Sequence, residues 1–400
     1  MNRLRNMLIA AGVCSFVLTN CSANEHEQSE YGAEPVEKIY TSAPETKEVV
    51  NNGVTNSRMN AITEAVKRCS PAVVGINVTE VRQMTVRDPF DDFFGSNPLF
   101  EQFFRRNRRV YNQEIRGLGS GFLISSDGYI LTNDHVAGTA TKIVVTLTNG
   151  EKYDAEIIGT DKTSDVALLK IDGKNLPYLP LANSDEVITG EWVIALGNPF
   201  GLFDINSKPT ITVGVVSNTG VNFSEEGRVY RDMIQTDAAI SSGNSGGPIV
   251  NALGEAIGMN TIIFSTAQNS RGAGSIGIGY AIPINRVKRI VDLIKAHKKI
   301  DREFDPGFYI QEIDDRIAKS YGLEKKQGVV VVQVKRGSSA DQAGLEPGDI
   351  VLEADGKKVL REEDLQVVIG DCVAGQTISL SILRNDETIV KKLKMLKPKN

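Results

Sequence analysis

Short runs of β-branched and apolar residues, separated by turn signals, make up most of this chain. Gly, Asn and Asp mark the turns, as in Asp127-Gly128 and Asn149-Gly150. Many short strands joined by close turns indicate a barrel or a sandwich. The clearest strand-like runs lie at residues 72–78, 121–125, 129–132, 142–147, 166–171, 192–196, 211–216 and 256–263.

Two stretches of the chain have apolar residues at helical rather than strand spacing, and they suggest where the domains begin and end. A short amphipathic helix is expected before Ser70-Pro71, and a longer one at 283–299, where Ile284, Val287 and Ile290 recur at helical spacing. We expect this second helix to close a first domain at 58–299. A smaller strand-rich domain follows at 300–397, with turn signals at Gly344 and Gly348.

Composition excludes several classes of protein. The 400 residues carry 45 basic and 50 acidic side chains, a net charge of −5, which argues against a dedicated nucleic-acid binder. Four Cys in a chain of this length exclude a disulfide scaffold. We expect Cys69 and Cys372, about 300 residues apart, to be buried free thiols in different domains rather than a bridge.

The N-terminus has the pattern of an export signal over residues 1–21. A basic start precedes an apolar stretch of twelve residues, Met7 to Leu18, which is too short to span a bilayer. The stretch ends at Cys21 in a sequence that resembles a lipobox, although Asn20 replaces the usual small residue. Conventional cleavage after Ala23 is the alternative. Residues 22–57 are polar and indicate a flexible tether.

An aromatic-rich segment separates two of the expected strands. Six Phe lie between Pro89 and Phe104, and an Arg-rich run follows. This segment could fold back over its own core. An insertion of about 30 residues is unusual unless it is functional, so we favour an interaction loop.

The strongest local signal is Gly243-Asn244-Ser245-Gly246-Gly247-Pro248. Glycines on both sides allow a tight turn that exposes the Ser245 hydroxyl and leaves the amides of Gly243 and Ser245 free to form an oxyanion hole. A glycine-rich hairpin with an incidental Ser is the plain alternative. An α/β-hydrolase elbow is disfavoured because a strand-turn-strand pattern, not a helix, follows the motif.

A Ser nucleophile needs a His base and an orienting carboxylate. The chain has three His: His26 lies in the tether and His297 at the polar end of the closing helix, which leaves His135, just after an apolar strand. Asp165 directly precedes the run 166–171 and could orient His135, or simply cap a turn at the strand edge. The order His, Asp, Ser is that of chymotrypsin.

Together these motifs resemble the HtrA/Deg family of serine proteases over residues 58–396. The resemblance also includes 196–201, and the last domain resembles a PDZ domain through its stretch 337–350. It implies a mainly β fold, in which a chymotrypsin-like double β-barrel is followed by one α+β PDZ domain. One barrel would provide His135 and Asp165, and the other Ser245.

The resemblance also implies roles for further residues. The amides of Gly243, Asn244 and Ser245 would face the oxyanion, and Ile240 would line a small aliphatic S1 pocket. Asn at 244 implies activation without propeptide removal, with ordering of loops 197–207, 219–232 and 261–275 as the switch. Ser241-Ser242 replaces the usual Asn-Pro. Phe308, Tyr309 and Ile310 stand where a peptide-binding PDZ loop is expected, with Tyr309 in place of Gly.

The expected function is that of an ATP-independent serine endopeptidase acting on unfolded or damaged proteins of the bacterial cell envelope. The resemblance implies a homotrimer that could assemble further, PDZ binding of peptide C-termini, and no metal or cofactor. Lipidation of Cys21 would tether the chain to a membrane. The alternatives are a regulatory protease that senses exposed C-termini and a protease-chaperone in which the holdase role dominates.

Overall fold

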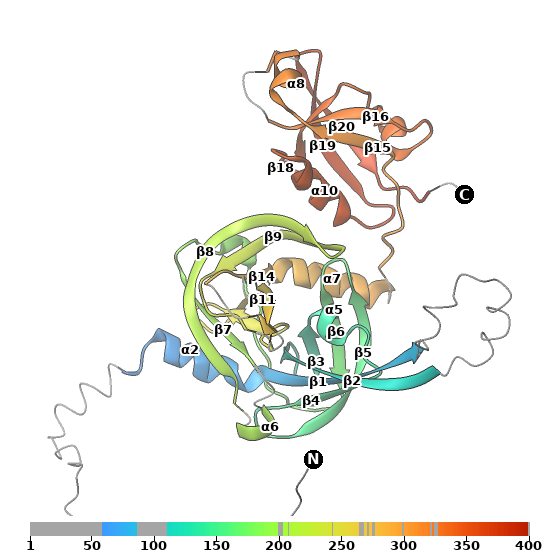
Figure 1. Ribbon diagram of the computed structural model, residues 1–400. Helices are drawn as coiled ribbons and strands as arrows, with labels where there is room; N and C mark the ends of the chain where they lie inside the picture. The colour runs from blue at the N-terminus through green and yellow to red at the C-terminus, as the bar shows by residue number, and fades with distance from the viewer. Residues whose placement is uncertain are drawn as a thin grey trace, which may run out of the picture. The chain divides into compact units, whose positions relative to one another are not determined.

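The computed structural model describes residues 58–85, 110–198, 203–206, 208–241, 243–263, 268–269, 272–273, 277–297, 300–320, 322–323 and 327–398. The expected export signal at 1–21 with Cys21, the tether at 22–57 and the Phe-rich segment lie outside these ranges. Figure 1 shows two β-barrels and a smaller domain of strands and short helices, so the expectation of a mainly β double barrel is confirmed.

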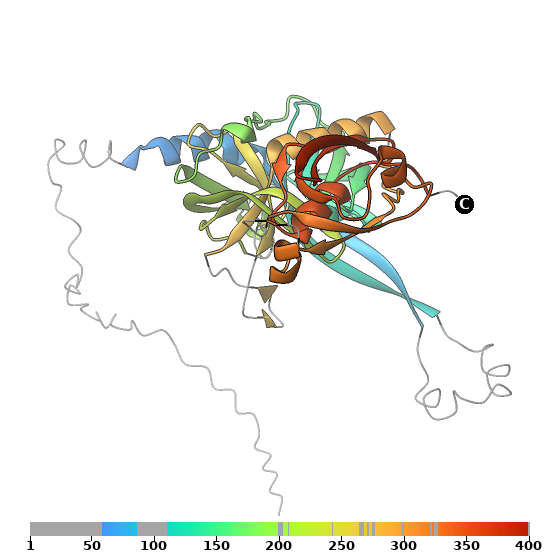
Figure 2. The same ribbon diagram turned by 90° about the horizontal axis from the view of Figure 1, so that it is seen from above.

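The first barrel closes in the strand order β1-β2-β3-β6-β5-β4 among the described residues. Its first two strands are much longer than the others and continue as a paired ribbon to Thr85 and Val110 (Figure 2). The turns predicted at Gly128 and Gly150 lie between its strands. Both glycines have positive φ, which glycine adopts without strain. Its elements are β1 (Val73–Thr85), β2 (Val110–Leu123), β3 (Tyr129–Thr132), α5 (Asp134–Ala137), β4 (Lys142–Thr146), β5 (Lys152–Asp161) and β6 (Val166–Ile171).

The second barrel closes in the order β10-β11-β14-β9-β8-β7. Its longest strands, β8 and β9, form a hairpin whose two-residue turn, Glu226-Gly227, has positive φ at both positions. Such a turn matches the twist of the flanking strands. The elements are β7 (Trp192–Gly197), α6 (Phe203–Asn206), β8 (Thr210–Glu225), β9 (Arg228–Thr236), β10 (Pro248–Val250), β11 (Ala256–Ile263) and β14 (Gly279–Pro283), with the short pair β12 (Gln268–Asn269) and β13 (Gly272–Ala273).

Two helices flank the barrels where the sequence predicts them. The helix α2 (Ala61–Cys69) is capped by Asn60, whose side chain accepts from the Thr63 amide. The helix α7 (Ile284–His297) buries Ile284, Val287, Ile290, Val291 and Ile294. This apolar face packs against β5 and β6 of one barrel and β11 and β14 of the other, so α7 holds the two barrels together.

The smaller domain is a sheet in the order β15-β16-β17-β19-β20, with β18 paired to β17. Its own buried cluster includes Val331, Leu365 and Ile382. Gly344 ends α9 in the left-handed conformation, as the turn signal predicts. The elements are β15 (Phe308–Glu312), α8 (Asp315–Ser320), β16 (Val329–Val334), α9 (Ser339–Ala343), β17 (Ile350–Ala354), β18 (Lys357–Lys358), α10 (Glu362–Gly370), β19 (Thr377–Arg384) and β20 (Glu387–Lys394).

The two described cysteines are buried free thiols, as predicted. Cys69 lies at the end of α2, and Cys372 belongs to the core of the smaller domain. Burial raises the pKa of each thiol to about 11. Both thiols therefore stay protonated and poorly nucleophilic at neutral pH.

Candidate active site

His135 lies on the single turn of α5, directly after β3. Asn133 precedes this turn, and its side-chain amide donates to the Asp165 carbonyl at 2.9 Å. The His135 amide donates to Asp165 Oδ1 at 3.0 Å. The imidazole Nδ1 lies 3.0 Å from Oδ1 and 2.9 Å from Oδ2 of the same carboxylate. Backbone and ring are thus fixed by one residue, with a third of the His135 side chain exposed.

Asp165 is fully buried at the turn before β6 and has φ of 58°, in the left-handed region. A non-glycine residue rarely adopts this conformation unless its surroundings enforce it. Burial disfavours the charged carboxylate, but hydrogen bonds and charge from His135, with a hydrogen bond from Thr261, outweigh burial and lower the pKa of Asp165. The carboxylate therefore stays ionised and holds Nδ1 of His135 as the protonated nitrogen.

Ser245 lies in the glycine-rich turn before β10. Gly246 has φ of +83°, and a Cβ there would lie 2.3 Å from both the Ser120 carbonyl and Thr132 Oγ1. A Cβ on Gly247 would lie 2.2 Å from the Leu196 carbonyl. Gly246 is therefore required because the turn presses directly on strands of the first barrel, and Gly247 because the turn also packs against β7 of its own barrel.

The Ser245 hydroxyl donates to the carbonyl of Thr261, with the two oxygens 3.1 Å apart. The sequence predicts a donation from Ser245 to His135 instead. The Thr261 carbonyl on β11 is a nearby buried acceptor, so the hydroxyl must rotate before His135 can accept its proton.

Thr261 also reaches the carboxylate. Its hydroxyl donates to Asp165 Oδ2 at 2.5 Å, the same oxygen that lies 2.9 Å from His135 Nδ1. One residue of the second barrel thus contacts both Ser245 and Asp165, which couples the two barrels at the site.

Ser120 of β2 supports the catalytic turn from the other barrel. Its amide donates to the Ser245 carbonyl at 3.0 Å, and its hydroxyl donates to the Gly243 carbonyl at 2.5 Å. The same hydroxyl accepts from the Asn198 amide at 2.7 Å. Ser120 itself is fully buried, and its three bonds fix the turn against the first barrel.

The amide of Asn244 does not fit the role that the sequence analysis assigns to it. It donates to the Ser241 carbonyl at 2.9 Å and closes a tight turn, so it is unavailable to an oxyanion in this conformation. Gly243, with φ of 94°, and Ser245 remain the candidate donors.

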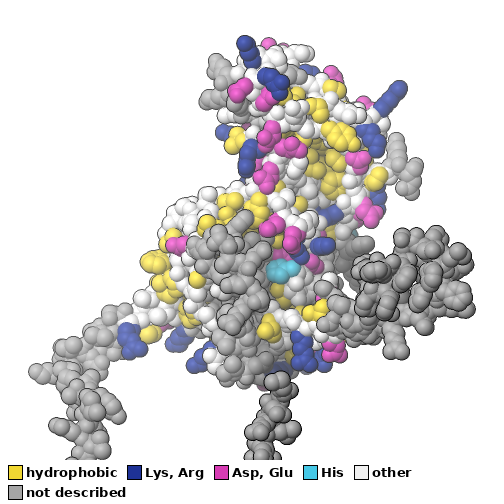
Figure 3. Space-filling model, in the orientation of Figure 1, with side chains coloured by type: hydrophobic (Ala, Val, Ile, Leu, Met, Phe, Trp, Pro, Cys, Tyr) yellow, Lys and Arg dark blue, Asp and Glu magenta, His cyan; other side chains and the backbone are white. Residues whose placement is uncertain are grey.

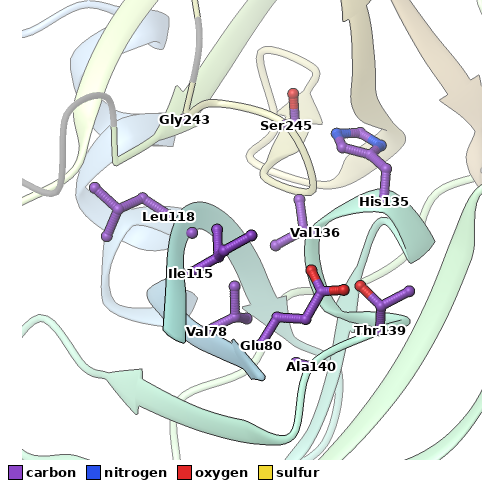
Figure 4. Close-up of a pocket in the computed structure, with 11 residues that line it drawn as sticks. Val78, Glu80, Ile115, Leu118, His135, Val136, Thr139, Ala140, Gly243 and Ser245 are labelled. Carbon is purple, nitrogen blue, oxygen red and sulfur yellow. The ribbon is translucent and has the colours of Figure 1, made fainter. Parts of the chain in front are cut away.

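His135 and Ser245 line one cavity of about 320 Å³ (Figure 4). Strands β1 and β2 provide its apolar wall, Val78, Ile115 and Leu118. Glu80 extends toward Thr139 from the same wall. The cavity can therefore accept a side chain of an extended polypeptide beside the two reactive groups.

Ile240, the proposed S1 residue, is fully buried in the second-barrel core. It is not among the residues that line the cavity, and a Cβ on Gly279 would lie 2.6 Å from it. Its assignment to an S1 pocket stays a prediction.

The three residues expected in a PDZ peptide-binding loop lie in a strand instead. Phe308, Tyr309 and Ile310 belong to β15 and pair with β16. The turn precedes them, at Gly307, whose φ is +73° and whose amide donates to Asp305 Oδ1. The apolar run favours the extended strand.

The predicted switch loops have different outcomes. Residues 219–232 form the β8–β9 hairpin, so this region is paired strand with register shifts around Val221 rather than open loop. Residues 199–202, 207, 264–267, 270–271 and 274–275 of the other two loops lie outside the described residues.

Sequence reasoning misses three residues around the site: Ser120, Thr261 and Arg228. Arg228 Nε lies 3.4 Å from Asp165 Oδ1. Each lies in a strand outside the quoted motifs. The Gly-Ser-Gly pattern at 119–121 is the one local signal that could have pointed to Ser120, because glycines mark close approach there.

No group of three or more His, Cys, Asp or Glu within the described ranges could hold a metal ion. Among the helices that the structure describes, none has the length and apolar character needed to cross a membrane.

Comparisons with known proteins agree with this architecture. A model described as a trypsin-like peptidase domain matches residues 119–259, and one described as a PDZ domain matches 306–395. A probable periplasmic serine endoprotease DegP-like of Ectopseudomonas mendocina is 39% identical over 343 residues, 83% of this chain and 69% of that protein. A protein of the same name from Hahella chejuensis is 38% identical, covering 81% and 67%.

Solved structures show the same similarity. The HtrA-type protease AlgW with a tripeptide has a TM-score of 0.64 at 33% identity, covering 86% of this chain and 99% of that one. A serine endoprotease from Yersinia pestis has a TM-score of 0.54 at 29% identity, covering 85% and 99%.

Proposed function

Because this chain belongs to the HtrA family of serine endoproteases with a PDZ domain, we propose that it degrades unfolded or damaged proteins of the bacterial cell envelope without ATP. The chemistry is peptide-bond hydrolysis by His135, Asp165 and Ser245. The observation that carries this proposal is the bonding of His135 to a buried, ionised Asp165 beside a cavity that also exposes Ser245.

The roles follow from the geometry. His135 takes the proton of Ser245 through Nε2, because Nδ1 is held by Asp165. Ser245 attacks the peptide carbonyl, and the amides of Gly243 and Ser245 bind the oxyanion. His135 then gives the proton to the departing amine. Water next attacks the acyl group while His135 takes its proton, and His135 returns that proton to Ser245 as the acid is released.

Peptide binding by the PDZ domain is supported by its edge strand. In the sheet order β15 is terminal, so one side of its backbone is available for an added strand. Helix α10 contacts β15 and lies beside this edge. Tyr309 is 62% exposed on β15, and Figure 3 shows hydrophobic side chains gathered over the smaller domain.

Control of the protease by the PDZ domain is supported by a buried cluster of charges. Asp371, at the end of α10, is 1% exposed and lies 2.9 Å from Arg286 of α7. Arg231 of β9 lies 3.5 Å away, and Arg289 also pairs with it. Burial disfavours the Asp371 carboxylate, but these charges outweigh burial and lower its pKa. A peptide on the PDZ domain could alter β9 through these contacts.

This contact favours a second candidate function, a regulatory protease. The β8–β9 hairpin carries both Arg231, which contacts the PDZ domain, and Arg228, which contacts Asp165. Binding of an exposed C-terminus at β15 would then activate cleavage of one dedicated target. Quality control predicts cleavage of many unfolded proteins without an added peptide.

The remaining proposals concern location and assembly. The relatives are named periplasmic, and the export signal expected at 1–21 supports the same compartment for this chain. Lipidation of Cys21 would tether it to a membrane, and the family resemblance supports a homotrimer.

The test is proteolysis of unfolded casein by the full chain and by Ser245→Ala. We expect complete loss of cleavage in the variant, with unchanged oligomer size by light scattering. Residual cleavage by Ser245→Ala contradicts the assignment. Repeating the assay with a folded membrane protein, with and without a C-terminal peptide, separates the two functions, since the regulatory protease cleaves the folded target when the peptide is present.

A further inference from the structure

Arg228 is a half-buried cation that lies close to the catalytic carboxylate but has no part in the usual roles of the triad. It opens β9 at the tip of the β8–β9 hairpin and is paired with Glu225 across the strands. The next residue, Val229, donates its amide to the Thr163 carbonyl at 2.8 Å. This bond fixes the hairpin tip of the second barrel against the turn that carries Asp165.

The guanidinium is directed at Asp165 by charge rather than by a hydrogen bond. Its Nε lies 3.4 Å from Oδ1, and no hydrogen-bond partner of this buried nitrogen occurs among the described residues. The side chain is 15% exposed. Because His135 and Thr261 already occupy the carboxylate oxygens as donors, Arg228 contributes an electrostatic contact at close range.

Arg228 lies within a group of acidic residues. Asp134 Oδ2 is 4.0 Å away and Glu226 Oε2 is 3.7 Å away. Burial, with the charges of Asp165 and Asp161, raises the pKa of Asp134, whereas Arg228 lowers it. The titratable groups around this cation are Asp134 of α5, Asp161 of β5, Asp165 and His135, Glu225 of β8, Glu226 of the turn and Tyr230 of β9.

We propose that Arg228 is a positioning residue of the active site, which holds the Asp165 carboxylate in place and opposes protonation of His135, so that the protease works at more acidic pH. This inference rests on the proposed triad. A protonated His135 cannot accept the Ser245 proton, so activity falls on the acid side as the imidazole becomes charged. A cation beside Asp165 disfavours the imidazolium and moves that fall to lower pH.

The test is the pH dependence of the full chain at low ionic strength. We measure kcat/KM on unfolded casein and the rate of Ser245 phosphonylation by a fluorophosphonate, from pH 5 to 9. In Arg228→Gln, the acid limb of both profiles moves to higher pH by about half to one unit. Arg228→Lys retains the charge, so its acid limb lies close to that of the unchanged chain. In Arg228→Gln, KM changes less than kcat.

Two further variants complete the test: one removes a cation that does not contact Asp165, and the other removes a negative charge near Arg228. Lys162→Gln removes an exposed cation from the turn before β6 and leaves the limb where it is in the unchanged chain. Glu226→Gln removes an exposed carboxylate near Arg228 and moves the limb to lower pH by about 0.2 unit, a small shift because water screens the group. This second variant provides the test if Arg228→Gln does not fold.

Some results overturn the inference. Profiles of Arg228→Gln that superimpose on the unchanged chain refute it, and so does an equal shift in Lys162→Gln. Where only Glu226→Gln is available, a shift to higher pH or no shift refutes it. Failure of the fluorophosphonate to label Ser245 in the unchanged chain overturns the proposed triad itself, which separates the two failures.

Discussion

Ser120→Ala tests whether the first barrel holds the catalytic turn in place. The change removes one buried hydroxyl that donates to the Gly243 carbonyl and accepts from the Asn198 amide. Alanine fits the space without strain, so the effect comes from the lost bonds. Both partner groups would be left without the Ser120 hydroxyl, Asn198 in a fully buried position and Gly243 in a half-buried one.

The expected magnitude follows from those two groups. An unsatisfied buried polar group costs about 1–3 kcal/mol, and water can partly satisfy the Gly243 carbonyl, so we expect about 2 kcal/mol less stability. The midpoint of urea unfolding should fall with an unchanged slope. Because Gly243 carries a proposed oxyanion donor, kcat on unfolded casein should fall while KM changes little.

Ser125→Ala is the matched control for this change. Ser125 also accepts from a backbone amide, that of Tyr129 at 3.0 Å, but it lies in a half-buried turn away from Ser245. We expect a loss below about 1 kcal/mol and unchanged kcat. If Ser120→Ala unfolds at the same urea concentration as the unchanged chain and retains its kcat, the support of the turn by Ser120 is refuted.

Two further changes test the turn and the domain contact. Gly246→Ala places a Cβ 2.3 Å from the Ser120 carbonyl at positive φ, so we expect at least about 2 kcal/mol of destabilisation by urea unfolding; normal stability would contradict the close approach. Asp371→Asn leaves Arg286 buried without its counter-charge, so thermal unfolding at pH 7 should show about 3 kcal/mol less stability. The lowered pKa of Asp371 means that its contribution is present above the unfolded-state pKa and is lost as pH falls through the folded-state value. The stability difference between the variant and the unchanged chain should therefore shrink below about pH 4, and a constant difference would contradict the assignment.

The sequence predicts the parts of this molecule whose signal is local. The helix α7 follows from the spacing of Ile284, Val287 and Ile290, and the turns at Gly128 and Gly150 follow from their residue types. The scarcity of histidine selects His135 without any structure. These features depend on neighbours within a few residues, so periodicity and turn chemistry are sufficient to find them.

The contacts that cross between barrels are not predictable in the same way. Thr261 is 96 residues from Asp165, and Ser120 is 123 residues from Gly243. Local sequence does not pair Thr261 with Asp165 or Ser120 with Gly243, because each contact depends on how two closed barrels dock. For the same reason the sequence misplaces the Asn244 amide, whose acceptor is set by the fold of the turn around Ser241.

The division of the site between two barrels also has a consequence during folding. His135 and Asp165 belong to the first barrel, whereas Ser245 and Thr261 belong to the second. A chain in which only one barrel has formed lacks a complete set of reacting groups. Newly made copies, which are themselves unfolded polypeptides, therefore cannot digest one another until both barrels have docked, so activity appears only once a copy has stopped resembling the proposed substrate.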